Sequence, residues 1–427
     1  MYNNTLCVLP FSHFSIKPNG DVKPCCRFLS HHPDHTNEFH ELNINNFSSA
    51  DAVLDSEVFK NLRNDMLAGK TIPGCSKCYQ EEAASGSSMR IGENIDLELE
   101  KHKNGEIKLR FIEVAFGNYC NLACRTCTSN LSTSWYADDK IISGYYSDRN
   151  LAKQTFNVKF NWKPEDFEFV EKIKFTGGEP MLHPDFIKFI DVIIASGYEK
   201  NITLDVFTNT SWVPKDKVLS RILKFKRVKL WLSVDGTGQL NDYIRHNASW
   251  SVVESSTDKW LDIQRQYPDT IGVILTPTVC IYNINKIENL IDWWVEKNKA
   301  IHEKHQLSET GDVVLSMLTY PLYLNIMNYP NKKKIIDKLT NEIDKLETNT
   351  YEFYVKKRTY IRIINTLKKF LTDESIDLND TIKYTKDLDA LRKQSLLTVN
   401  NELYNDINEY LIKNNTSYNN IQGNVNV

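Results

Sequence analysis

Three cysteines carry the clearest chemical signal in the chain. Cys120, Cys124 and Cys127 stand at the spacing C-x3-C-x2-C, on a loop expected to follow an apolar strand. Cysteine thiolates hold iron–sulfur clusters, and a cubane cluster normally takes four of them. Three clustered thiolates therefore leave one iron free for a ligand that is not protein, just as catalytic metal sites keep an open position. A structural zinc site or a chance group of buried cysteines is the alternative interpretation.

A second motif follows about 50 residues later. Thr176, Gly177, Gly178, Glu179 and Pro180 end an apolar stretch that is expected to be a strand. The two glycines allow a close approach of the backbone, and the proline fixes the exit of the chain. Glu179 and the backbone carbonyls suit a cation such as an ammonium group. The two motifs, in this order, resemble those of the radical S-adenosylmethionine (SAM) superfamily.

This resemblance implies two cofactors, a catalytic [4Fe-4S] cluster at the three cysteines and S-adenosyl-L-methionine. The open iron would receive the amino and carboxylate groups of SAM, whose ammonium would also meet Thr176–Glu179. An electron donor such as flavodoxin or ferredoxin would drive reductive cleavage of SAM. The resulting 5′-deoxyadenosyl radical would then abstract hydrogen from a substrate, a peptide side chain or a small molecule. The sequence identifies no further catalytic residue and does not fix the substrate.

Eight of the nine cysteines lie within the first 127 residues, which favours cluster or metal binding over scattered core thiols. The turn signal Asn19-Gly20-Asp21 should bring Cys7 and Cys25 together, and a helical spacing over 51–68 leads back toward Cys75 and Cys78. The pattern C-x12-G-x4-C followed by C-x2-C resembles a SPASM or twitch auxiliary-cluster module, here placed before the barrel. The resemblance extends to Glu82, Gly86 and Arg90. It implies a second [4Fe-4S] cluster held by Cys7, Cys25, Cys75 and Cys78, with Cys26 spare; a structural zinc knuckle is the alternative.

Alternation of apolar and helical segments predicts the fold. The apolar stretches are 108–115, 172–176, 203–209, 228–235, 272–279 and 313–318, and helical periodicity separates them. Such alternation predicts right-handed βαβ units and an α/β fold, which here matches the family's partial (β/α)6 TIM-like barrel. The expected domains are a cluster module at 1–104, the barrel at 105–325, a helical region at 326–413 and a disordered tail at 414–427.

Polar side chains mark the ends of the expected strands, where catalytic residues of such sheets lie. Asn209, Ser233 and Asp235 could donate to or accept from the ribose hydroxyls of SAM, or they could simply form turns. Arg245 could contact the SAM carboxylate or form a surface salt bridge. Cys280, after the fifth strand, is either a buried thiol or close to the substrate. Residues 128–168 form a long aromatic-rich insertion that could line a substrate pocket or pack against the N-terminal module.

Bulk properties narrow the class of protein. The chain has 427 residues, 41% hydrophobic and 25% charged, with a net charge of −3. A small negative net charge would not attract nucleic acid or an anionic membrane to the protein as a whole. No apolar run approaches the roughly 18 residues of a membrane helix, and the N-terminus lacks a signal-peptide pattern. We therefore expect a cytoplasmic protein without a membrane partner.

Two alternative functions belong to other classes. One is a non-enzymatic iron–sulfur or zinc scaffold that binds a protein partner, supported by the lack of a recognisable substrate motif. The presence of all three cysteines together with the G-G-E-P motif counts against it. The other is modification of a nucleic acid by the same radical chemistry, which would need a basic groove. The run Lys332–Lys334 is better explained as a solvated helix start.

Overall fold

The computed structural model describes most of the chain in two compact units. The described residues are 5–29, 42–86, 88–97, 99, 107–146, 158–212, 215–302, 313–348, 350–369, 371 and 378–425. Unit 1 comprises Met1–Tyr119, Lys153–Phe207 and Lys215–Lys229, and unit 2 comprises Cys120–Ala152, Thr208–Pro214 and Leu230–Val427. The domain boundaries expected from the sequence stay predictions, and the one at residue 104 lies outside the described residues.

Unit 1 contains a largely parallel sheet. Its strands run in the order β2-β1-β3-β5-β6, namely Val22–Lys23, His13–Ile16, Phe111–Val114, Lys172–Phe175 and Thr203–Thr208, the last residue of β6 belonging to unit 2. Only the β1–β2 pair is antiparallel. The register aligns a fully buried apolar row on one face, formed by Phe14, Ile112, Ile173 and Leu204. The neighbouring positions align a polar row, formed by Ser15, Glu113, Lys174 and Asp205.

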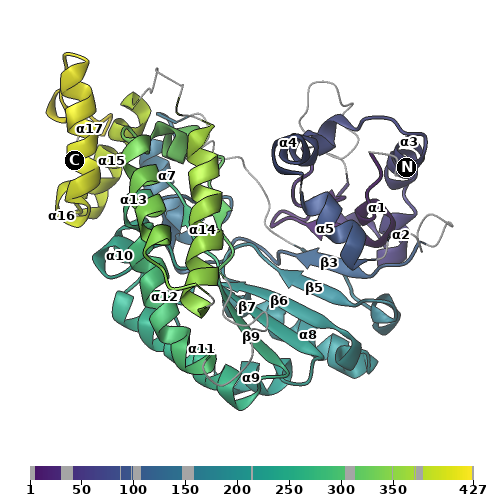
Figure 1. Cartoon of the computed structure of the whole chain (residues 1–427). Helices are drawn as coiled ribbons and strands as arrows, with labels where there is room; N and C mark the ends of the chain where they lie inside the picture. The colour runs from purple at the N-terminus through teal and green to yellow at the C-terminus, as the bar shows by residue number, and fades with distance from the viewer. Residues whose placement is uncertain are drawn as a thin grey trace. The chain divides into compact units, whose positions relative to one another are not determined.

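The N-terminal segment of unit 1 forms the expected hairpin, and it also extends the sheet. Gly20 occupies the turn with a φ of +87°, a conformation that favours glycine. Strand β1 then pairs in parallel with β3, a contact that the sequence analysis did not predict. Five helices gather beside this edge (Figure 1): α1 Leu9–Ser12, α2 Ala50–Leu54, α3 Glu57–Leu67, α4 Ser76–Ser85 and α5 Met89–Asp96. The single helix expected over 51–68 is wrong, because Ser56 takes an extended conformation and starts a second helix.

Two further helices of unit 1 match the expected periodicity. They are α8, Pro184–Ser196, and α9, Asp216–Ile222. His183 caps α8, since the backbone N–H of Asp185 donates to its Nδ1 at 3.2 Å. Phe189 of α8 is buried against Phe167 and Trp162. These aromatic contacts place Trp162 and Phe167, near the end of the 128–168 insertion, in the core of unit 1.

Unit 2 continues the parallel strands and carries most of the helices. The backbone N–H of Ser233 donates to Thr208 at 2.8 Å, and that of Thr276 donates to Leu232 at 2.8 Å. The strands and helices of this part are β7 Arg227–Leu232, which begins in unit 1, β9 Ile271–Leu275, β10 Thr278–Val279, β11 Ser316–Met317, α10 Gln239–Ile244, α11 Trp250–Gln266 and α12 Ile287–His302. The stretch expected as a sixth strand forms only β11 and a single parallel bridge from Val313 to Leu275. The structure thus shows a mixed α/β fold with parallel strands, while the six-unit partial barrel remains a prediction.

The C-terminal region is helical, as expected. Its helices are α13 Lys332–Asp344, α14 Tyr351–Lys368, α15 Asn379–Arg392, α16 Leu396–Val399 and α17 Asn401–Lys413. The helical segment over 380–412 is interrupted, because Lys393 adopts a left-handed conformation with φ +52° and ends α15. No helix within the described ranges is long and apolar enough to cross a bilayer.

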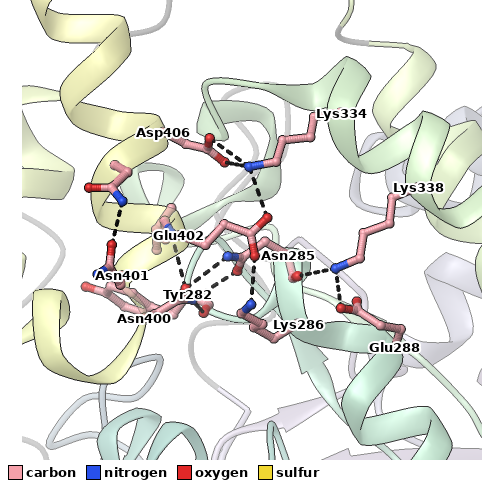
Figure 2. Close-up of polar contacts among 12 residues, drawn as sticks. Tyr282, Asn285, Lys286, Glu288, Lys334, Lys338, Asn400, Asn401, Glu402 and Asp406 are labelled. Atoms are coloured by element: carbon pink, nitrogen blue, oxygen red, sulfur yellow. Dashed lines mark hydrogen bonds and ion pairs between the residues drawn. The ribbon is translucent and has the colours of Figure 1, made fainter.

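A polar network holds α17 against α13 and against the short 3-10 helix η9, Ile284–Lys286, that precedes α12 (Figure 2). Asn285 and Asn400 exchange side-chain hydrogen bonds, each of 2.9 Å, and both are buried. Lys334 pairs with Glu402 and Asp406, each at 3.0 Å. The lysine run at 332–334 is therefore partly neutralised by acidic side chains and is not simply a solvated helix start.

The polar C-terminal tail is ordered over 414–425, so the expectation of disorder is wrong for these residues. Lys386 of α15 donates from Nζ to the carbonyls of Tyr418 and Ile421 at 2.8 and 2.6 Å. The backbone N–H groups of Asn424 and Val425 both donate to Oδ1 of Asp387, at 2.7 and 2.9 Å. These contacts give hydrogen-bond partners to backbone groups of the tail that its polar composition had suggested would bind water.

Candidate iron–sulfur and cofactor sites

The loop that carries the three cysteines lies in unit 2 and is fixed by backbone contacts. The two-residue strand β4, Ala123–Cys124, pairs in antiparallel fashion with β8, Arg245–His246, so Cys124 faces Arg245. The segment after the loop, η4 Thr133–Trp135, supports it from behind. Trp135 donates from Nε1 to the carbonyl of Cys124 at 2.9 Å, and Ser134 donates from Oγ to the carbonyl of Cys120 at 2.8 Å. The loop conformation is therefore set by its carbonyl groups, and the thiols are not needed for this purpose.

The three thiols differ in burial. Cys120 is buried, whereas Cys124 and Cys127 are partly exposed as residues. Burial of the Cys124 sulfur raises the pKa of its thiol to about 11, although the nearby Arg245 guanidinium lowers it. A thiol must lose its proton to bind a metal. Because water does not reach the Cys124 sulfur, a bound cationic group would have to stabilise the negative charge of its thiolate.

Asn209 lies at the same loop. Its Nδ2 donates to Oδ1 of Asn121 at 2.8 Å and approaches Sγ of Cys120 at 3.7 Å. Its Oδ1 accepts from the backbone N–H of Ser211 at 3.0 Å, which is a turn-forming contact. Both alternatives given above for this residue, turn former and contact near the cofactor, are thus compatible with its position.

Arg245 and Asp235 form a buried ion pair at 2.7 Å. The other carboxylate oxygen of Asp235 accepts from the backbone N–H of Thr278 at 2.7 Å. Arg245 therefore forms a salt bridge, as one of the two alternatives expected, but this salt bridge is buried and does not lie on the surface. Ser233 is half-buried at the end of β7, within two residues of this pair. The predicted roles of Ser233, Asp235 and Arg245 toward SAM stay predictions.

The G-G-E-P segment lies in unit 1, tightly packed on the end of β3. Gly177 and Gly178 have φ values of +74° and +54°. A Cβ atom on Gly177 would lie 2.6 Å from Cβ of Ala115. The backbone N–H of Glu179 donates to the carbonyl of Tyr119 at 2.8 Å. Thr176 donates from Oγ1 to Glu113 at 3.4 Å, and Glu179 is buried with 1% exposure.

The N-terminal cysteines line a small cavity in unit 1. Its lining includes all four thiols predicted to hold the auxiliary cluster, Cys7, Cys25, Cys75 and Cys78. Cys26, predicted to be spare, does not line the cavity, and its sulfur lies 4.0 Å from the sulfur of Met89. Gly74 is required beside this cavity, since a Cβ atom there would lie 2.5 Å from the Phe28 ring.

The cavity is electrostatically unfavourable for bare thiolates. Burial raises the pKa of Cys7, Cys25, Cys75 and Cys78, and neighbouring thiols raise the first three further. Arg90 opposes this effect at Cys7 and Cys75, and it is held by Glu82 at 2.9 Å and by the carbonyl of Leu6 at 2.7 Å. Four buried thiols and a fixed cation suit a cluster whose thiolate ligands carry negative charge. Among the described side chains, no three His, Cys, Asp or Glu groups meet at the position of a single ion.

Two features of the cluster loop escaped the sequence analysis. Trp135, in the first half of the 128–168 insertion, is fully buried beneath the loop. The side chain of Arg125, inside the loop, is also fully buried and pairs with Asp389 at 2.6 Å. The tryptophan eight residues after the last cysteine could have indicated a side chain packed beneath the loop, whereas nothing near Arg125 in the sequence indicates its partner.

Cys280 is fully buried, and burial raises the pKa of its thiol to about 12.

Comparison with known proteins gives partial matches. The SPASM model, an iron–sulfur cluster-binding domain, matches residues 7–79. An uncharacterized protein of Methanocaldococcus jannaschii is 24% identical over 232 residues, covering 51% of this chain and 74% of that protein. A GTP 3′,8-cyclase of a Sulfurovum species is 24% identical over 192 residues, or 45% of this chain. The chain spans 53% of that cyclase, about half its length.

Solved structures match more weakly. Native anSMEcpe with bound AdoMet is 15% identical, covers 55% of this chain and 61% of that chain, and has a TM-score of 0.36. A TM-score this low supports no conclusion about the fold or the function of this chain. The SPASM match, in contrast, spans the four cysteines that line the cavity and confirms the resemblance inferred from their spacing. Together with the C-x3-C-x2-C and G-G-E-P motifs, this match supports the chain's resemblance to radical SAM enzymes that carry a SPASM iron–sulfur cluster-binding domain, which here spans residues 7–79.

Proposed function

We propose that the chain cleaves SAM reductively at a [4Fe-4S] cluster held by Cys120, Cys124 and Cys127, and that it uses the resulting radical to modify a substrate. The observation that carries this proposal is the cluster loop itself. Its three cysteines stand on a backbone that Trp135 and Ser134 fix through the carbonyls of Cys124 and Cys120. When bound, the cluster would supply one electron to SAM and leave one iron for the amino and carboxylate groups of SAM.

The residues of this chain would act by binding and orientation. The three thiolates would hold the cluster, and Arg245, held in place by Asp235, would keep its guanidinium opposite Cys124. Glu179 would accept the ammonium of SAM, since a buried carboxylate makes strong hydrogen bonds to a cation. Gly177 and Gly178 would let the backbone carbonyls of the same segment approach the cofactor, because neither position can accept a side chain.

We further propose that the N-terminal cavity holds an auxiliary [4Fe-4S] cluster through Cys7, Cys25, Cys75 and Cys78. Four thiolates saturate such a cluster, so it would serve electron transfer or structure and would not bind SAM. A pocket lined by four thiols supports an occupant that several sulfur atoms bind together. The structural zinc knuckle is the rival occupant, because four cysteines also satisfy zinc.

The substrate is proposed only as a class, a peptide side chain or a small molecule. The match to the cyclase covers less than half of this chain, so we do not propose the substrate of the cyclase for this protein. Electron delivery by a flavodoxin or ferredoxin and a cytoplasmic location complete the proposal. Among the alternatives, nucleic-acid modification is disfavoured because Lys334 is paired with Glu402 and Asp406 and contributes no free basic surface.

Elemental analysis and electron paramagnetic resonance test the proposal. Anaerobically reconstituted protein should carry about eight iron atoms per chain and negligible zinc. The triple variant Cys120→Ala/Cys124→Ala/Cys127→Ala should keep about half of the iron, and only protein with these three cysteines should change its reduced spectrum when SAM is added. Cys26→Ala and Cys280→Ala serve as controls that should lose no iron. A triple variant that purifies with one zinc and no iron would exclude the auxiliary cluster, and a spectrum indifferent to SAM would exclude the catalytic one.

A further inference from the structure

Arg125, between Cys124 and Cys127, connects the cluster loop to the C-terminal helix α15. Its side chain is fully buried, and its Nη2 donates to Oδ1 of Asp389 at 2.6 Å and to Oε1 of Gln394 at 3.0 Å. Its Nε donates to the carbonyl of Tyr243 at 2.9 Å, and its guanidinium stacks 3.6 Å from the Tyr243 ring. An arginine guanidinium keeps its charge in proteins. A buried charge of this kind depends on its partner.

Helix α15 contacts the loop at two more points. Tyr384 donates from Oη to the carbonyl of Arg125 at 2.7 Å. Arg392 donates from Nε to Asp138 at 2.9 Å, and its guanidinium lies 4.4 Å from the ring of Trp135. Trp135 in turn donates to the carbonyl of Cys124. The carbonyls of Cys124 and Arg125, adjacent residues of the loop, thus depend directly or through Trp135 on one helix that lies about 260 residues later in the sequence.

The C-terminal region also makes contacts that do not involve the cluster loop. The network of Lys334, Glu402 and Asp406 attaches α17 to α13 without touching the cluster loop (Figure 2). Asp389 has a second task, since its Oδ2 accepts from the backbone N–H of Leu396 at 2.8 Å and fixes the turn after α15. Asp389 therefore couples the conformation of this turn to the charge inside the loop.

We propose that Asp389 and Arg392 are positioning residues for the cluster loop, and that α15 sets the geometry and the charge that the three cysteines present to their cluster. This inference rests on the proposed function in one respect, the presence of a cluster at the three cysteines. The contacts that restrain the loop exist in the protein without iron. Asp389 acts through Arg125, and Arg392 acts through Trp135. Neither residue is proposed to contact SAM or substrate.

Hydrogen–deuterium exchange of the full chain without iron tests the restraint. In Asp389→Asn, the carboxylate charge is lost while the side-chain shape stays, and we expect peptides covering 120–135 to exchange roughly tenfold faster or more. Arg392→Lys should act in the same direction, because lysine lacks the planar group that stacks on Trp135. The matched control Asp406→Asn removes a carboxylate from the α17 network and should leave the exchange of 120–135 unchanged. Equal exchange in Asp389→Asn and wild type, or equal acceleration in Asp406→Asn, would overturn the proposal.

A spectroscopic readout separates positioning from general stability. In reconstituted protein, Asp389→Asn should alter the g values of the SAM-responsive signal, Asp389→Glu should restore them in part, and Asp406→Asn should leave them at the wild-type values. If the loop bound no cluster, the exchange result would stand while no SAM-responsive signal existed, so the two failures can be told apart. A normal, SAM-responsive signal in Asp389→Asn would contradict the positioning role.

Discussion

The carbonyl oxygen of Tyr119 occupies the space that a side chain at Gly178 would need. A Cβ atom on Gly178 would lie 2.2 Å from this oxygen, and Gly178 has a φ of +54°. Tyr119 directly precedes Cys120, the first cysteine of the cluster loop. Gly178→Ala must therefore displace backbone next to that loop. We expect this variant to be strongly destabilised in urea denaturation and to lose SAM binding.

Gly197→Ala is the matched control for the Gly178 substitution. Gly197 also has a positive φ, +80°, but a Cβ atom there would meet nothing within 4 Å. This variant should pay only the conformational cost of about 1–2 kcal/mol and should bind SAM normally. Equal stability loss in the two variants would show that the contact with Tyr119 has no energetic weight.

Glu179→Ala should weaken SAM binding while the iron content and the cluster absorption stay at wild-type levels. The reason is that Glu179 is proposed to meet the ammonium of SAM and no iron atom. A hydrogen bond to a charged group is worth roughly 1.5–3 kcal/mol, or on the order of 10- to 150-fold in affinity. Equilibrium binding measures the loss, with Glu179→Gln as the variant that keeps the shape and removes the charge. Unchanged affinity in both variants would show that the role is misassigned.

His13 should make stability depend on pH. It is fully buried, its Nδ1 donates to the carbonyl of Phe111 at 2.9 Å, and burial lowers its pKa from 6.5 to about 3. The stability that its neutral form contributes is present above about pH 6.5 and is lost as the pH falls toward 3, because only the unfolded chain takes up the proton. The maximum slope is about 1.4 kcal/mol per pH unit. Urea denaturation of the iron-free protein between pH 7 and 5 should show a smaller slope for His13→Asn than for wild type; identical slopes would contradict this account.

Local patterns predicted many of the elements of this chain. The turn at Gly20, strands β3, β5, β6, β7 and β9, and helices α8 and α12 follow from turn chemistry and apolar periodicity. The resemblance based on the spacing of Cys7, Cys25, Cys75 and Cys78 also named four cysteines that line one cavity. Ser56 is a good helix-start residue, and the break between α2 and α3 could have been predicted from it.

Long-range relationships could not be predicted in this way. The parallel pairing of β1 with β3 joins His13 to Phe111 and has no local signal. The same holds for Arg125 and Asp389, which are 264 residues apart. The end of α15 at Lys393 was missed because a lysine rarely takes a left-handed conformation. Tertiary contacts, and not local preference, decide these positions.

Formation of 5′-deoxyadenosine is the most direct test of the central claim, that three cysteines on the loop support reductive cleavage of SAM. Reconstituted protein, reduced under anaerobic conditions and given SAM without substrate, should produce 5′-deoxyadenosine and methionine. Cys124→Ala should produce neither, while Cys280→Ala, which removes a fully buried thiol, should retain cleavage. Persistent 5′-deoxyadenosine formation in Cys124→Ala, or none in wild-type protein with its full iron content, would contradict the account.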